Sequence, residues 1–245
     1  MRNVLNTLRV LEEVASRQPI GVGELARVLD IPKSSVQRAL VTLHTAGWIR
    51  PAAGEVTRWV ITTRALAVGG RASGDLDLRG AALPIMEELR RRTGETIHLT
   101  VPEDGKMVLI ERLETDKPVR TSMALGHALP LHASANGKAV LANSSSEVLR
   151  PLLADELPRY TDTTITDPDE LRAELAAIRE RGFAVNRGEW RSDVGSVAAA
   201  VMGGHEKPIA SLSVNIPMSR LTHESEAGFG AAVNEAASSL SARLG

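Results

Sequence analysis

The sequence contains no cysteine, and it lacks any run of 18 consecutive apolar residues. The first absence excludes disulfides, thiolate metal sites and cysteine nucleophiles, and it favours residence in the cytosol. The second leaves no candidate for a transmembrane helix. Residues 1–16 also lack the apolar run of a secretory signal. We therefore expect a cytoplasmic protein of 245 residues, long enough for one large domain or for two smaller ones with their own cores.

Several motifs of enzyme chemistry are also missing. The sequence has neither the H-E-x-x-H metal motif nor the G-x-S-x-G nucleophile motif. Its six histidines show no paired ligand spacing, so solvated or core roles are expected for them rather than metal binding. The segment 136–139 (Asn-Gly-Lys-Ala) is similar to a phosphate loop but lacks its first glycine and its Ser or Thr. The G-x-G-x-x-A match at 21–26 follows an amphipathic helix instead of a strand. We expect no cofactor, no metal and no catalytic residues.

The net charge of −1 conceals an asymmetry along the chain. Residues 1–64 hold nine Lys or Arg against five Asp or Glu, and the remainder holds 20 against 25. A basic N-terminal region on an acidic body suggests that only this region meets a polyanion. Small domains often vary by a few charges, so the charge alone decides nothing.

The N-terminal region has the pattern of a helix-turn-helix. Apolar residues at 4, 8, 11 and 15 predict one buried face of a first helix, which Gln18-Pro19 ends. A second helix is predicted from about Gly23 to Leu29, and Asp30-Ile31-Pro32 forms the turn. A third helix follows from about Lys33 to Ala46, with an apolar stripe at 36, 39, 40 and 43.

The opposite face of this third helix is short, hydrogen-bonding and cationic, with Ser34, Arg38 and Thr42 among its residues. Such a face suits a helix in the DNA major groove, while the N-terminal turn of the helix can meet phosphates. Segments 48–52 and 58–62, around the turn at 53–55, predict a two-stranded wing. The alternative is a generic three-helix bundle with a solvated face. The predicted DNA contacts are Lys33, Ser34, Ser35, Gln37, Arg38, Thr42, Arg50 and Arg58.

A Gly-rich stretch then indicates a domain boundary. We expect a winged helix-turn-helix domain at 1–64, a partly helical linker at 65–78 and a second domain at 79–245. In the second domain, a helix with a stripe at 78, 82, 85 and 89 should end at Gly94. Strands are predicted at 95–101 (half-buried), 107–113, 119–125, 183–189, 194–202 and 209–216. Helices are predicted at 133–142, 145–154, 168–181 and over about the last 20 residues. This order indicates an α+β fold with an antiparallel sheet.

Two of these strands carry unusual polarity. One face of 209–216 holds Ser211, Ser213 and Asn215, and one face of 194–202 holds only small side chains, Ser196 among them. A sheet face of small and hydroxylic residues can line a ligand cavity. Plain exposure to solvent is the alternative interpretation.

Two stretches identify a family resemblance. Residues 25–47, with Ile31-Pro32-Lys33-Ser34-Ser35 in their middle, resemble the helix-turn-helix of IclR-family regulators. Residues 126–139 match the G-x-x-x-P-L-H-A-S/T-x-x-G-K-A signature of that family's effector domain. Segments 181–184 and 198–201 also fall where the family has similar runs, so the resemblance extends over nearly the whole chain.

The resemblance implies a C-terminal domain similar to GAF and profilin-like folds that binds a small metabolite. It also implies a homodimer or dimer of dimers that acts at a palindromic DNA operator. Asn136 and Asn186 depart from the residues frequent in the family, so the effector need not be a simple keto acid. The ligand contacts that the resemblance implies are Thr121, Leu129, Ala135, Asn136, Asn186, Val194, Ser196, Ser213 and Asn215.

The sequence thus predicts a metabolite-responsive transcriptional regulator, either repressor or activator, with a preference for a carboxylate-bearing effector because residues 133–136 would begin a helix. The alternative is a protein with the domain organisation of a regulator, whose second domain is an enzyme or a ligandless dimerisation module. No nucleophile or acid/base pair can be assembled for an enzyme. Ser196, Ser213 and Asn215 argue against a filled, ligandless core.

Overall fold

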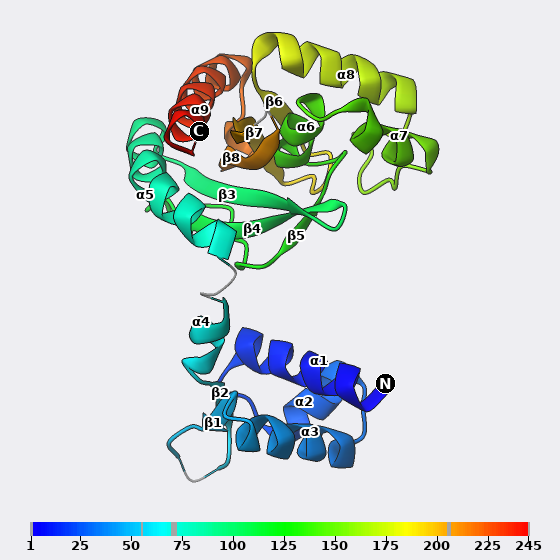
Figure 1. The fold of residues 1–245 in the computed structure, drawn as a ribbon, viewed down its shortest axis with the longest axis vertical. Helices are drawn as coiled ribbons and strands as arrows, with labels where there is room; N and C mark the ends of the chain where they lie inside the picture. The colour runs from blue at the N-terminus through cyan, green and yellow to red at the C-terminus, as the bar shows by residue number, and fades with distance from the viewer. Residues whose placement is uncertain (1, 55, 70–72, 205–206, 245) are drawn as a thin grey trace. The chain divides into compact units, whose positions relative to one another are not determined.

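The computed structural model describes residues 2–54, 56–69, 73–204 and 207–244. Internal contacts divide the chain into two compact units, Met1–Ser73 and Gly74–Gly245. Both units mix helices with antiparallel strands, as the α+β prediction requires (Figure 1). Within the described ranges, no helix is long and apolar enough to cross a membrane.

The N-terminal unit begins with three helices and a short hairpin, before α4 (Arg64–Gly69). Asp30 ends the second helix with a φ of 51°, and Pro32 precedes the third. The turn between them, at residues 30–32, is the one predicted. The elements are α1 (Arg2–Arg17), α2 (Val22–Leu29), α3 (Lys33–Thr45), β1 (Ile49–Pro51) and β2 (Trp59–Ile61). Glu55, in the predicted wing turn, lies outside the described residues.

The core of this unit confirms the predicted stripe of α3, because Val36, Ala39, Leu40 and Leu43 are all buried. The predicted stripe of the first helix is wrong. Val10 and Val14 of α1 are the buried pair, whereas Val4 and Leu8 are 65% and 49% exposed. The helix carries apolar residues on two sides, and only one side can pack against α3.

The region predicted as a linker begins with α4 (Arg64–Gly69), and α5 (Ser73–Thr93) starts the C-terminal unit. Residues 70–72 of the predicted linker lie outside the described residues. Gly94, at a φ of 66°, follows the end of α5 as predicted. This left-handed conformation is one that glycine adopts without a steric cost.

The C-terminal unit is built on a six-stranded antiparallel sheet in the order β5-β4-β3-β8-β7-β6. The strands are β3 (Thr96–Glu103), β4 (Lys106–Leu113), β5 (Ala128–Pro130), β6 (Ala184–Arg187), β7 (Val194–Met202) and β8 (Pro208–Pro217). The helices are α6 (Ala135–Ala142), α7 (Ser146–Ala154), α8 (Pro168–Arg181) and α9 (His223–Leu244), and the 3-10 turn η2 spans Met218–Arg220.

Helices cover both faces of this sheet. On one face, α5 and α9 pack on the apolar positions of β3, β7 and β8 and form the main core. On the other face, α6 crosses β7, β8 and β6, and α8 packs on the outside of α6 (Figure 1). Every residue of β3 from Thr96 to Val101 is therefore buried, so the predicted half-buried strand is wrong. The polar and apolar residues that alternate along β3 face opposite sides of the sheet, and both sides are covered, so neither set faces solvent.

A second correction concerns residues 119–125, which form no strand. The strand that pairs with β4 is the short β5, and it takes only the Lys106–Val108 part of the edge, where Met107 pairs with Leu129. Segment 114–127 is instead held by side chains: Arg112 donates to the Met123 carbonyl, and Ser122 donates to Glu114 at 3.2 Å. Because this segment lies beside the polar side of the sheet, we call it the covering loop.

Candidate DNA-binding face and effector site

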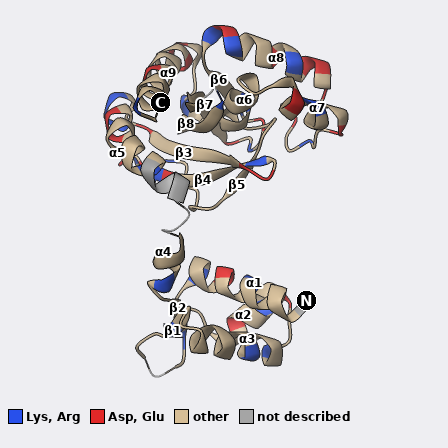
Figure 2. Ribbon diagram, viewed as in Figure 1, with Lys and Arg blue, Asp and Glu red and all other residues tan. Residues whose placement is uncertain are grey.

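The exposed face of α3 contains five of the predicted DNA contacts. Lys33, Ser34, Gln37, Arg38 and Thr42 are exposed, and the structure brings them together on one helix. Figure 2 shows basic but no acidic positions along α3. Pro32 offers no side-chain cap, and the Ser35 N–H already donates to the Pro32 carbonyl at 2.8 Å, so the N–H groups of Lys33 and Ser34 are the ones left for an anionic ligand.

Ser35 and the wing complete the predicted set, with one difference. Ser35 is half-buried and accepts a 3.4 Å hydrogen bond from Arg38, whereas Arg50 is exposed on β1. Arg58 does not project freely toward a phosphate. Its guanidinium donates to Glu24 of α2 at 3.0 Å and to the Pro19 carbonyl at 2.9 Å. This ion pair with Glu24 offsets part of the positive charge of Arg58, which the sequence analysis predicted to contact DNA.

The predicted effector residues of the strands meet on the α6 side of the sheet. One row across the sheet aligns Asn186, Ser196, Asn215 and Thr96. The next row aligns Ala198, Ser213, His98 and Arg112, and a third aligns Ala200, Ser211 and Thr100. We define the polar sheet face as Thr96, His98, Thr100, Asn186, Ser196, Ser211, Ser213 and Asn215.

The whole polar sheet face is buried, with no member more than 5% exposed. Plain solvent exposure, the alternative that the sequence left open, is therefore excluded for these strands. Burying so many polar groups is costly unless each finds a partner. The arrangement is that of an internal polar site.

Four of these polar groups bond to one another or to Asn136. Asn136 of α6 donates to Thr100 at 3.1 Å and to Ser211 at 3.3 Å. Asn215 donates to the Ser213 hydroxyl at 2.9 Å. Of the other predicted contacts, Leu129 lies in a small apolar cluster beside the covering loop, and Ala135 packs between α6 and α8.

The remaining two predicted contacts, Thr121 and Val194, line a surface pocket of 360 Å³ between the covering loop, η2 and the start of β7. Val194 pairs with Pro217, two positions along the strands from the Ser196–Asn215 pair. The pocket therefore lies at the end of the polar sheet face.

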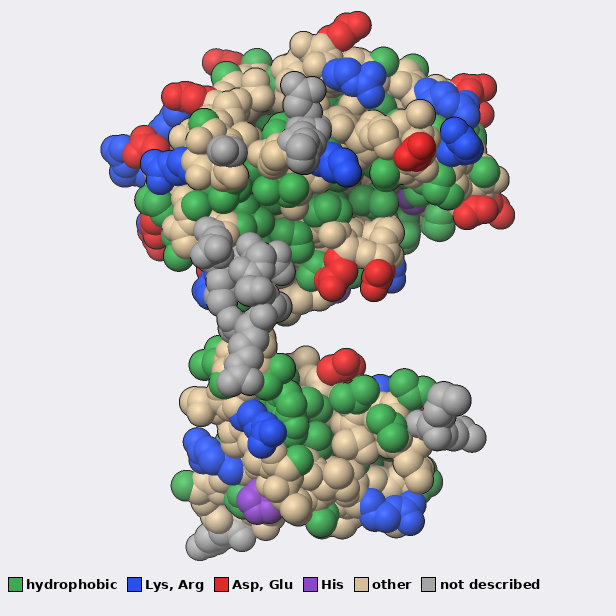
Figure 3. Space-filling view, viewed as in Figure 1, with side chains coloured by type: hydrophobic (Ala, Val, Ile, Leu, Met, Phe, Trp, Pro, Cys, Tyr) green, Lys and Arg blue, Asp and Glu red, His purple; other side chains and the backbone are tan. Residues whose placement is uncertain are grey.

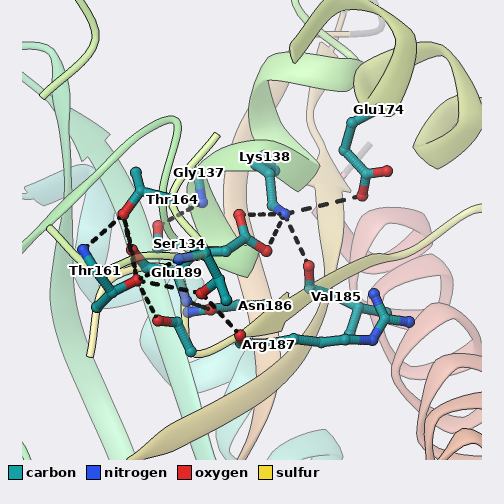
Figure 4. Close-up of polar contacts among 12 residues, drawn as sticks. Ser134, Gly137, Lys138, Thr161, Thr164, Glu174, Val185, Asn186, Arg187 and Glu189 are labelled. Atoms are coloured by element: carbon teal, nitrogen blue, oxygen red, sulfur yellow. Dashed lines mark hydrogen bonds and ion pairs between the residues drawn. The ribbon is translucent and has the colours of Figure 1, made fainter. Parts of the chain in front are cut away.

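Lys138, from the segment similar to a phosphate loop, has a different role. Its ammonium group is buried and donates to both Glu189 carboxylate oxygens at 2.6 and 2.7 Å and to the Val185 carbonyl at 2.8 Å (Figure 4). Asn186 accepts a hydrogen bond from the Glu189 N–H at 2.7 Å. Lys138 thus ties α6 to the β6–β7 connection and positions Asn186. Burial raises the pKa of Glu189 although the nearby Lys138 acts in the opposite direction.

The other residues of this signature build the start of α6. Ser134 caps the helix by accepting from the Gly137 N–H at 3.1 Å. A Cβ at Gly137 would lie 2.2 Å from the Leu131 carbonyl oxygen, so only glycine fits. The helix begins at Ala135, not at residue 133, and one of its first N–H groups is already taken. This reduces the anion affinity expected from the helix N-terminus.

Sequence reasoning missed His98 and Arg112. His98 is 1% exposed, and neither of its ring nitrogens has a hydrogen-bond partner among the described residues. Desolvation, followed by the charge of Arg112, lowers the pKa of His98 to about 4. The alternation of Thr96, His98 and Thr100 was the available signal, but it was interpreted as a solvent-facing side.

Comparison with known proteins agrees with this geometry. Residues 4–52 match the IclR helix-turn-helix domain, and residues 71–242 match the bacterial transcriptional regulator IclR C-terminal domain. The transcriptional repressor IclR of Escherichia coli K12 is 31% identical over 249 residues, which cover 100% of this chain and 90% of the relative. The regulator KdgR of the same organism is 31% identical over 244 residues, covering 99% and 92%.

Solved structures agree as well. The IclR protein of Thermotoga maritima superposes with a TM-score of 0.84 at 25% identity, covering 100% of this chain and 99% of the other. An IclR homologue from Microbacterium hydrocarbonoxydans, complexed with 4-hydroxybenzoate, gives a TM-score of 0.81 at 26% identity, covering 99% and 98%.

These matches define a DNA-binding transcriptional regulator with a helix-turn-helix domain and a C-terminal effector-binding domain. The chain belongs to the IclR family.

Proposed function

We propose that this regulator binds a palindromic operator through α3 and changes its DNA affinity when a small carboxylate-bearing effector occupies the polar sheet face. The observation that carries the proposal is the burial of this face while polar atoms on and beside it, in His98 and Thr121, lack hydrogen-bond partners among the described residues. A ligandless dimerisation module would have no use for such a face. A regulator of this kind acts in the cytoplasm, where its DNA is.

On the DNA side, the proposal assigns base contacts to the exposed face of α3 and phosphate contacts to its first turn and to the wing. Arg38 and Gln37 have the length and the donors to read base edges. Lys33, Ser34 and Arg50 are exposed for phosphates, with Ser35 and Thr42 beside them. Arg58 contributes less than the others because Glu24 pairs with it.

Assembly is proposed as a homodimer or a dimer of dimers. One winged helix reads few base pairs, so useful specificity requires two half-sites bound by a symmetric pair. Val4, Leu5 and Leu8 of α1 are 65%, 60% and 49% exposed, and Figure 3 shows hydrophobic side chains grouped at the surface over this helix. A second copy of the chain would cover them. Light scattering checks this, and a particle of 26.2 kDa at micromolar concentration contradicts it.

On the effector side, the proposal assigns ligand contacts to Thr121, Leu129, Ala135, Asn136, Asn186, Val194, Ser196, Ser213 and Asn215. The homologue complexed with 4-hydroxybenzoate supports an acid as the ligand class. We propose binding without catalysis. The competing function, an enzyme in the C-terminal unit, would need a nucleophile or an acid/base pair directed at the site. The polar sheet face offers Ser, Thr and Asn side chains together with one neutral histidine.

An effector can change DNA affinity only by binding the DNA-competent and incompetent arrangements unequally. Such coupling is typically about 1–3 kcal/mol, or roughly 5- to 150-fold in operator affinity. The experiment is a thermal-shift screen of organic acids, followed by titration of an operator selected from random duplex DNA, with and without the acid that binds.

Ser213→Ala is the informative variant in this titration, because it deletes a hydroxyl at the centre of the polar sheet face. It should raise the effector concentration needed for the response. Ser239→Ala, an exposed position on α9, is the matched control. Equal effector sensitivity of all three proteins removes Ser213 from the site. If none of the acids changes the operator affinity, the result favours the ligandless module.

A further inference from the structure

His98 differs from Asn136 and from the polar residues of β8 in one respect. Asn136, Ser211, Ser213 and Asn215 all have hydrogen-bond partners within the protein, but both ring nitrogens of His98 lack one in the described chain. A neutral imidazole has one N–H donor and one acceptor, and burying either without a partner costs stability. Such a group, 1% exposed, is explained when a ligand supplies the missing partner.

The position of His98 places it within the effector site. It lies opposite Ser213 of β8 on one side and opposite Arg112 of β4 on the other. The neighbouring row toward the surface pocket holds Ser196 and Asn215. Arg112 donates to the Met123 carbonyl, so the covering loop is attached directly beside His98.

We propose that His98 binds the carboxylate of the effector and takes up a proton from solvent when it does so. The inference rests on the proposed function, since it assumes that an acid enters the polar sheet face. It adds the residue that recognises the acid and the proton that accompanies binding. The only covalent change is a proton transfer: the imidazole gains a second N–H bond, the solvent or buffer acid gives up that proton, and the imidazolium pairs with the carboxylate.

The charges around the site explain why a proton is required. Arg112 is already bonded to the covering loop, and its guanidinium lies 3.5 Å from the Glu114 carboxylate. Glu114 is paired in turn with Arg120 at 3.2 Å. From α6, Lys138 is held by Glu189. A carboxylate buried among these groups therefore lacks a cation of its own, and desolvation would oppose its binding.

His98 can supply that cation. The aligned positions of β7 and β8 around it are Ala, Ser and Asn, which cannot titrate. Without a ligand, desolvation and then Arg112 hold the pKa of His98 at about 4, so the ring is neutral at pH 7. An adjacent carboxylate favours the charged form and raises this pKa. At any pH between the pKa of His98 in the free protein and its pKa in the complex, the bound state therefore holds one more proton than the free state.

The first test is calorimetry on the wild-type protein. A panel of small organic acids that includes 4-hydroxybenzoate is titrated at pH 7 in phosphate and in Tris, whose ionisation enthalpies differ. The expected result is uptake of about one proton per site, with affinity falling about tenfold per pH unit above the pKa of the complex. The uncharged 4-hydroxybenzamide should bind without proton uptake.

The second test uses His98→Asn, which keeps an amide donor but cannot take a proton. At pH 6 its affinity for the acid should fall at least tenfold, and both proton uptake and the pH dependence of binding should disappear. The matched control is His223→Asn, at a side chain that is 97% exposed. It should leave affinity and proton uptake unchanged.

The outcomes separate this inference from the proposed function. Acid binding without proton uptake in the wild type, or uptake that persists in His98→Asn, overturns the role of His98 even if operator affinity still responds. Proton-linked binding that leaves operator affinity unchanged supports His98 and overturns effector control. A panel without any binder overturns the acid class itself. The calorimetry on the wild-type protein can overturn the inference by itself, so the test does not depend on whether His98→Asn folds.

Discussion

The two units place their functional polar side chains in opposite environments. In the N-terminal unit the polar face of α3 is exposed. In the C-terminal unit the polar sheet face is almost fully buried. DNA is a large polyanion that must be met at the surface, whereas a small metabolite is recognised by enclosing it. Ser and Thr serve both purposes, and burial distinguishes the two uses.

This contrast predicts that removing a buried charge is more damaging to stability than removing an exposed one. Lys138→Met should lower the free energy of unfolding by about 3–5 kcal/mol, because it leaves the Glu189 carboxylate buried without its cation. Arg172→Ala breaks an exposed pair with Asp169 and should cost at most about 1 kcal/mol. Urea denaturation of both variants measures the difference. Adding Glu189→Gln to Lys138→Met should recover part of the loss.

If Lys138→Met is no more damaging than Arg172→Ala, the ion pair does not hold α6 to the β6–β7 connection. The architectural role assigned to the signature lysine would then be wrong.

The next effect concerns the exposed face. Arg38→Ala should cost about 1–3 kcal/mol of specific operator binding if its guanidinium reads a base, while leaving stability nearly unchanged. Arg17→Ala, an exposed residue of α1 paired with Glu13, is the control for simple loss of charge. Fluorescence anisotropy on specific and unrelated duplexes measures both. An equal loss for the two variants would reject α3 as the reading helix.

The contrast between the units also explains what could be predicted from the sequence. On α3 the apolar stripe of Val36, Leu40 and Leu43 was enough, because a helix with one buried side must expose the other. On β3 the alternation of Ile97 with His98 was equally clear, but it does not say what covers the second face. That depends on α6 and the covering loop, which are distant in sequence. Even the correctly predicted polar strands could not be distinguished from solvent-exposed ones.

The covering loop shows a further limit. Residues 119–125 contain strand-forming side chains, yet they form no strand, and β5 takes the edge of β4 only at Lys106–Val108. Lys117 donates to the buried Glu95 at 2.8 Å, and Arg220 of η2 pairs with the same carboxylate at 2.7 Å. These long-range ion pairs decide the path of the loop. Local propensity carries no information about them.

A smaller effect is expected from His98 in the absence of any ligand. Its pKa is about 4 in the folded protein and about 6.5 when unfolded, so the unfolded state binds the extra proton between these values. The contribution to stability is complete above pH 6.5 and is lost as the pH falls toward 4. From pH 7.5 to pH 5 the wild type should lose about 2 kcal/mol more than His98→Asn.

Urea unfolding at the two pH values tests this, and the variant itself is the control for every other titrating group. Parallel loss in both proteins would show that His98 is not buried in a neutral, unpartnered state.

The smallest effect on DNA binding is expected at Arg58, whose side chain is exposed but is also held in an ion pair within the N-terminal unit. The side chain is exposed, yet Glu24 holds its charge, and the Gly21 N–H and then Arg58 keep the pKa of Glu24 below its usual value. Glu24 is therefore ionised at neutral pH.

Arg58→Ala should change the salt slope of DNA binding by less than the roughly one unit that a full phosphate contact gives. Glu24→Gln should steepen the slope, because it releases the guanidinium for DNA. Titrations over a series of salt concentrations measure both slopes, with Arg50→Ala as the control for a wing arginine without a carboxylate partner among the described residues. A full one-unit loss for Arg58→Ala would mean that DNA separates this pair on binding, and that exposure, not the ion pair, decides how the wing contributes.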